Sequence, residues 1–207
     1  MNKKRHTIKY ILVDLLSAIV VWKVFFLLTQ TAHNIYNPSD LLTSIEDSTF
    51  WLGLVVYPIY WNLIYVMAGM YRRVYRKTRL IELEETVITT LIGVLLLFFV
   101  FILDESYLTV DNPKKLFVGL LFGHFILTYI GRLSITHSTI KKIHKRKIGF
   151  NTLLIGTQKN AINVFNEIEN QIYSSGNIFK GFLHAKIFEK NKVSALLPHL
   201  GGVNDLS

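Results

Sequence analysis

Four long apolar blocks, separated by short polar segments, fill the first two thirds of the chain. They cover residues 8–28, 50–71, 83–103 and 115–135. Each block has about 20 residues, and at about 1.5 Å per residue a helix of this length crosses a hydrocarbon layer of about 30 Å. We therefore predict a membrane α-helical fold, with a four-helix transmembrane bundle in residues 1–147.

After residue 147 the pattern becomes that of alternating strands and helices. A strand is predicted over residues 152–155, ending at Gly156, and residues 160–173 have apolar positions on one helix face, with Asn160 as the N-cap. A second strand is expected over residues 178–183 and a short third over 200–203. Residues 188–197 are ambiguous, and 204–207 are typical of a helix start. We predict a right-handed βαβ unit, so that residues 148–207 form an incomplete α/β Rossmann-like (CoA-binding-like) module.

The basic residues alternate between the two ends of the blocks. They gather before the first block, between the second and third, and after the fourth, whereas residues 30–49 contain neither lysine nor arginine. The positive-inside rule then places both termini in the cytoplasm, as in a multi-pass protein of the bacterial inner membrane. The net charge of +9 is thereby explained as a topology signal and a contact for anionic lipids, which disfavours nucleic acid as a partner. The chain has no cysteine, which excludes disulfides and thiolate metal sites.

Several polar residues lie inside or beside the apolar blocks. Asp14 and Lys23 project about 180° apart around their helix, so they cannot easily pair with each other. Asp14 is either part of a buried relay or faces other helices near the cytoplasmic end while Lys23 extends to the far side; we favour the second interpretation. For Glu82, Glu84 and Glu85 we favour a solvated helix start over a catalytic cluster.

Other positions concern helix packing. Pro58 predicts a kink in the second helix, and Asn62 is expected to hydrogen-bond to a neighbouring helix. The glycines of Gly119-Leu-Leu-Phe-Gly123 have the spacing that lets another helix approach closely. His124 has no second ligand candidate three or four residues away, so we interpret it as a hydrogen-bonded packing residue and expect no metal site.

The turn after the first predicted strand is the candidate ligand site. The dinucleotide fingerprint is matched only by Gly156, Gln158 and Ala161, and His184 stands where an acidic residue would bind the ribose of NAD. A smaller phosphate-bearing ligand at the helix N-terminus remains open, as does a turn that binds nothing. The candidate cofactor-binding residues are Gly156, Thr157, Lys159, Asn160 and Ala161. No catalytic residue is predicted.

In order and spacing, five segments resemble the N-terminal half of the large polyprenyl-phosphate hexose-1-phosphate transferases. They are Ala-Gly-Met-Tyr-Arg at 68–72, the stretch 149–161, Asn-Glu-Ile at 166–168, Gly-Phe-Leu at 181–183 and Leu-Pro-His-Leu-Gly-Gly-Val-Asn-Asp-Leu at 197–206. The resemblance implies a membrane enzyme that moves a sugar-1-phosphate from a nucleotide sugar to undecaprenyl phosphate, at the start of exopolysaccharide, O-antigen or capsule synthesis.

The same resemblance implies that this chain is the membrane-anchoring and regulatory part. The family's catalytic domain, with its Asp-Glu pair and Mg²⁺, is not among these 207 residues, so we expect the chain alone to be inactive and to hold no cofactor of its own. A nucleotide or nucleotide sugar is the ligand implied for the Rossmann-like module, and a homo-oligomer is left open.

Two other interpretations stay open. The chain resembles, less closely, the N-terminal part of a membrane-bound nucleotide-sugar 4,6-dehydratase or epimerase, and it could be a standalone membrane scaffold or nucleotide-sensing protein. The segment Leu-Pro-His-Leu-Gly-Gly at 197–202 favours the transferase. A small transporter is disfavoured, because the blocks contain few paired ionisable groups and no inverted repeat.

Overall fold

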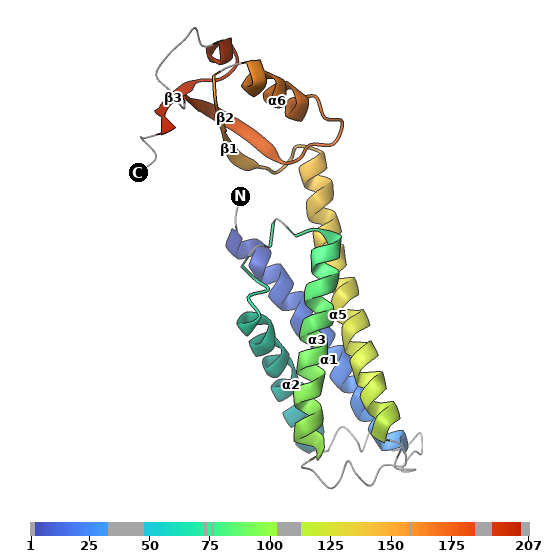
Figure 1. Ribbon diagram of the computed structural model, residues 1–207. Coiled ribbons are helices and arrows are strands. Elements are labelled where there is room, and N and C mark those ends of the chain that lie inside the picture. The colour runs from blue at the N-terminus through green and yellow to red at the C-terminus, as the bar shows by residue number, and fades with distance from the viewer. Residues whose placement is uncertain are drawn as a thin grey trace. The chain divides into compact units, whose positions relative to one another are not determined.

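The computed structural model describes residues 3–32, 48–72, 74–75, 77–102, 113–157, 159–184 and 192–203. The chain divides into two compact units, a helical unit of residues 2–137 and an α/β unit formed chiefly by residues 138–207 (Figure 1). Each unit has its own hydrophobic core. They are described separately below.

The four predicted long helices are confirmed. They are α1 (Lys3–Ala32), α2 (Ser48–Met67), α3 (Arg79–Ile102) and α5 (Pro113–His144). Each is long and apolar enough to cross a membrane. The first and last extend beyond the predicted bounds, because their polar and basic ends continue the helix without a glycine or proline to stop it.

A left-handed glycine ends α2 earlier than predicted. Gly69 has φ 70°, its N–H donates to Val66 O at 3.0 Å, and Met70 N–H donates to Tyr65 O at 3.1 Å. This pair of hydrogen bonds is the Schellman motif, which terminates a helix and turns the chain. Tyr71, which was expected to lie in the helix, therefore follows it.

The closest helix contacts are made at glycines. A Cβ built on Gly131 of α5 would lie 2.4 Å from Val13 Cγ1 of α1, and one on Gly93 of α3 would lie 2.4 Å from a ring atom of Trp61 of α2. Gly53 of α2 is similarly covered by a tryptophan of α1. These positions exclude any larger side chain without rearrangement.

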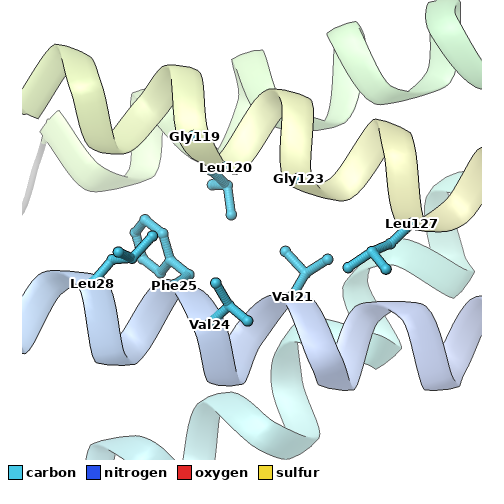
Figure 2. A pocket seen from close by; sticks show the side chains of 8 residues that line it. All are labelled: Val21, Val24, Phe25, Leu28, Gly119, Leu120, Gly123 and Leu127. Carbon is cyan, nitrogen blue, oxygen red and sulfur yellow. The ribbon is translucent and has the colours of Figure 1, made fainter.

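The predicted close approach at Gly119 and Gly123 is wrong for the described residues. A Cβ at either position would have no other atom within 4 Å. Here a groove of about 50 Å³ lies between α1 and α5 (Figure 2). Its lining is entirely apolar: Val21, Val24, Phe25, Leu28, Gly119, Leu120, Gly123 and Leu127.

Apolar side chains cover most of the outside of the helical unit, where Lys23 of α1 is also exposed, while a group of ionised side chains lies inside it. On α1, Leu12 and Leu16 are 52% and 61% exposed, whereas Asp14, between them, is fully buried. Glu82 and Arg132 are also fully buried. A water-soluble domain has the opposite distribution, because burying a charge is costly and exposing apolar surface to water is unfavourable.

The α/β unit contains a three-stranded parallel sheet in the order β1-β2-β3. Its elements are β1 (Phe150–Ile155), α6 (Lys159–Glu169), β2 (Asn177–His184), the 3₁₀ helix η3 (Lys192–Ala195) and β3 (His199–Gly202). The three predicted strands are confirmed with slightly wider or shifted bounds. The stretch 188–197, which the sequence left ambiguous, contains η3, and residues 188–191 lie outside the described residues. The helix start expected at 204–207 also lies outside them.

One face of the sheet carries the core of this unit. Its buried residues are Leu154, Phe182, Val193 and Leu197. Four partly buried side chains pack against them: Ala161, Ile162 and Phe165 of α6, and Phe179 of β2. The helix predicted over residues 160–173 ends at Glu169, so Ile172 does not belong to its apolar face as expected. The Ile172 side chain is 91% exposed. On the other sheet face Ile155 is 58% exposed, whereas its partner Leu183 is only 3% exposed, so the described residues cover that face in part.

The end of α5 is tied to the end of α6. Arg146 adopts φ 55°, and its N–H donates to Ile143 O at 2.9 Å, in the manner of a C-terminal glycine. A residue with a Cβ is strained in this conformation. The Arg146 guanidinium makes an ion pair with the Glu169 carboxylate at 2.7 Å and also donates to the Glu169 backbone oxygen, which helps to hold the strained residue.

Candidate functional site

The turn between β1 and α6 requires its glycine. Gly156 has φ 129°, a conformation that residues with a Cβ rarely adopt, and a Cβ there would come within 3.3 Å of Ala161 Cβ. Its N–H donates to Leu183 O at 2.9 Å, which extends the pairing of β1 with β2. The turn is therefore tight, and α6 starts close to the sheet.

The other candidate residues of this turn lie at the amino end of α6. Lys159 is the first residue of the helix and is exposed, Thr157 is half-buried, and Ala161 packs against the core. Asn160 is exposed within the first turn, so its predicted role as N-cap is wrong by at least one position, because α6 begins before it. Gln158 lies outside the described residues. The free N–H groups of the first turn could hold a phosphate, which stays a prediction.

A histidine pair lies on the neighbouring strands. His184 ends β2, and its Nδ1 is 2.8 Å from Nε2 of His199, the first residue of β3. In the sequence analysis His184 was noted only because it replaces the acidic residue expected in an NAD site, and His199 was not singled out. Their contact joins two strands at positions 15 residues apart, so no local sequence pattern reveals it.

A buried ion pair lies at the centre of the helical unit. Arg132 of α5 donates from Nε to Asp14 Oδ1 and from Nη2 to Asp14 Oδ2, both at 2.7 Å, and both side chains are fully buried. Such a two-point contact is the strongest geometry for this pair of groups. The favoured interpretation of Asp14, that it faces other helices, is confirmed.

A second buried carboxylate extends this contact to α3. Glu82 Oε2 accepts hydrogen bonds from Thr136 at 2.9 Å and from Tyr10 at 3.3 Å. Glu82 Oε1 accepts no hydrogen bond but lies 3.6 Å from Lys77 Nζ and 3.9 Å from Arg132 Nη1. The prediction that Glu82 belongs to a solvated helix start is wrong. Its side chain is fully buried, because α1 and α5 extend beyond Tyr10 and Thr136, the residues that contact it.

Tyr71 provides a further hydrogen bond to the Asp14 carboxylate. Its hydroxyl donates to Asp14 Oδ2 at 2.7 Å and lies 3.2 Å from Asn62 Oδ1. Burial, and then the negative charge of Asp14, raises the pKa of the Tyr71 hydroxyl, so it stays a donor. Asn62 also donates to Pro58 O of its own helix at 3.0 Å, so the predicted bond to a neighbouring helix is wrong. We call Asp14, Arg132, Glu82, Lys77, Tyr10, Tyr71 and Thr136 the ionic cluster.

His124 is buried inside the helical unit, on α5 eight residues before Arg132. Its Nε2 is 2.8 Å from the Tyr65 hydroxyl, its Nδ1 is 3.2 Å from the Tyr57 hydroxyl, and its ring stacks on Trp61 at 3.6 Å. Its interpretation as a hydrogen-bonded packing residue is confirmed. The Tyr65 ring also lies 4.1 Å from the Arg132 guanidinium, which joins His124 to the ionic cluster.

The ionic cluster connects α1, α3 and α5 with Tyr71, which follows α2, through hydrogen bonds and opposite charges. Among the described residues, no three histidine or acidic side chains are placed to hold a metal ion. Each ionised group instead faces a charge of opposite sign. The arrangement therefore acts to fix the register of the helices, in surroundings where an unpaired charge would be very costly.

A stripe of polar residues in the sequence could have revealed this cluster. His124, Thr128, Arg132 and Thr136 follow one another at intervals of four along α5, and Glu82, Thr86 and Thr90 do so along α3. Residues four apart share one helix face. A polar face on an apolar helix points to the interior of a bundle.

Comparison with protein-family models, with curated proteins and with solved structures finds no match to this chain.

Proposed function

We propose that this chain anchors and regulates a polyprenyl-phosphate hexose-1-phosphate transferase at the inner membrane, with the α/β unit on the cytoplasmic side. The observation that carries the anchoring role is the distribution of charge in the helical unit. Its exterior is mostly apolar along four helices of membrane-crossing length, and its buried ions are paired. Lipid is the surroundings in which this distribution is stable.

The α/β unit supports the regulatory role. Its strand order β1-β2-β3 is that of half a doubly wound sheet, in which ligands bind at the carboxyl ends of the strands. Gly156 and the amino end of α6 lie at that edge. The segment that favoured the transferase in the sequence forms β3 and the core residue Leu197 before it. A nucleotide or nucleotide sugar is the ligand class that this edge would sense.

The test compares the chain with the complete product of its gene. Membranes that contain either one are incubated with undecaprenyl phosphate and a nucleotide sugar that carries a radiolabelled sugar phosphate. We expect label in the lipid fraction and release of nucleoside monophosphate with the complete product, and neither with residues 1–207 alone.

Two outcomes would contradict the proposal. Turnover by the 207-residue chain alone would show that the chemistry lies within it. A Tyr-x-x-x-Lys reductase-type domain in the complete gene product, with 4,6-dehydration of the nucleotide sugar in place of lipid labelling, would assign the chain to the dehydratases.

A further inference from the structure

The contact between His184 and His199 is set up by the sheet. Phe182 pairs with His199 and His184 with Gly202 across β2 and β3, and Phe182 N–H donates to Pro198 O at 3.0 Å. The His199 ring also leans on the buried Phe182 ring, with 5.1 Å between centroids. The backbone therefore fixes both imidazoles at neighbouring positions, independently of any ligand.

The short distance between the two rings requires a lone pair on one of them. Nδ1 of His184 and Nε2 of His199 are 2.8 Å apart, so one of them carries a proton and the other offers a lone pair. A ring nitrogen with a lone pair is the form that binds metal ions.

The pairing also places the two imidazoles close enough to share one ion, since metal to nitrogen bonds are about 2.0 Å long. Rotation about the soft terminal torsions of the two side chains would direct both lone pairs at one ion. His199 is exposed, which leaves room for water as further ligands.

We propose that His184 and His199 form a binding site for a divalent transition-metal ion, with Cu²⁺ bound more tightly than Ni²⁺ or Zn²⁺. Imidazole suits all three ions, and Cu²⁺ has the highest affinity for such ligands among divalent first-row metals. The described residues provide two protein ligands at this place, and water completes the coordination. The site is independent of the proposed transferase role, so either can fail without the other.

The test uses the full chain, purified without a polyhistidine tag and titrated with Cu²⁺. Electron paramagnetic resonance should show nitrogen splitting from two imidazoles in the unmodified protein, and acid should release the bound ion, because protons compete with the metal for the ring nitrogens. His184→Ala and His199→Ala should each weaken Cu²⁺ binding by at least about tenfold, because the second ligand then no longer acts within the same molecule.

His137→Ala is the matched control, since His137 is also exposed but contacts Arg79 in the helical unit. It should bind Cu²⁺ as the unmodified protein does. Nitrogen splitting from a single imidazole in the unmodified protein would overturn the proposal without reference to any variant. Unchanged affinity in both His184→Ala and His199→Ala would do so as well.

Discussion

At the scale of single residues, the pair of Asp14 and Arg132 should dominate the stability of the helical unit. Both charges are fully buried and satisfy each other at two points. Replacing one partner leaves the other charged and buried, at a cost of about 3–5 kcal/mol.

We therefore expect Arg132→Met to lower the free energy of unfolding by about 3–5 kcal/mol. The double variant Asp14→Leu with Arg132→Met should regain most of this loss, because neither member of the pair then remains as an unpaired charge, and Glu82 keeps Lys77 beside it. Unfolding in detergent, followed by circular dichroism, measures both. Ser134→Ala is the control, since Ser134 is exposed on the same helix and bonds only to Ile130 O. Equal losses in the single and double variants would contradict a buried pair.

Tyr71 should make the stability depend on pH above 10. Its pKa is raised in the folded protein, so its contribution is fully present below the unfolded pKa of about 10 and is lost as the pH rises through the folded-state pKa. Tyr71→Phe removes the hydrogen bond to Asp14 and should cost about 1.5–3 kcal/mol at pH 8. The difference between the two proteins should shrink at pH 11. A constant difference from pH 8 to pH 11 would argue against the contact with Asp14.

At the scale of helices and strands, replacing each of two glycines on α5 by valine should lower the stability of the helical unit by different amounts. Gly131→Val places methyl groups against Val13 and should cost about 1–3 kcal/mol, whereas Gly123→Val enters open space and should cost little. Thermal unfolding in the same detergent compares the two variants. If Gly123→Val is the more harmful, another helix covers the groove lined by Gly119 and Gly123.

The turn after β1 gives a second prediction at this scale. Gly156→Val forces a β-branched residue into φ 129° and against Ala161, a strain of about 1–3 kcal/mol. It should make residues 148–207 sensitive to protease while the helices still insert. Protease resistance equal to that of the unmodified protein would count against a Rossmann-type turn. Lys180→Ala, at an exposed position of β2, is the control.

Which elements could be predicted from the sequence depends on the range of the contacts that form them. The four helices and three strands follow from local apolar patterns, so their presence and order are predicted, although α5 continues nine residues past its predicted end at 135. Helix ends set by caps, as at Gly69 and Arg146, were less accurate. The ionic cluster joins Asp14 to a residue 118 positions away, and the histidine pair also depends on tertiary pairing, so single-sequence patterns gave only indirect signals.

At the scale of the whole molecule, the account rests on four membrane crossings. In the proposed topology, four crossings would place both chain ends on one side, and the basic loops would assign that side to the cytoplasm by the positive-inside rule. Charge pairing inside the bundle permits ionised residues in this setting. The proposed partners and ligands all depend on this topology, because nucleotide sugars are cytoplasmic substrates in the proposed reaction.

Cysteine labelling in intact cells tests this topology most directly, because the chain has no cysteine of its own. Lys114→Cys, at the start of α5, and Lys180→Cys, in β2, are each exposed positions. A membrane-impermeant maleimide should label Lys114→Cys in intact cells and Lys180→Cys only after the membrane is opened. Labelling of Lys180→Cys in intact cells, or equal labelling of both before the membrane is opened, would contradict the four-crossing topology with a cytoplasmic α/β unit.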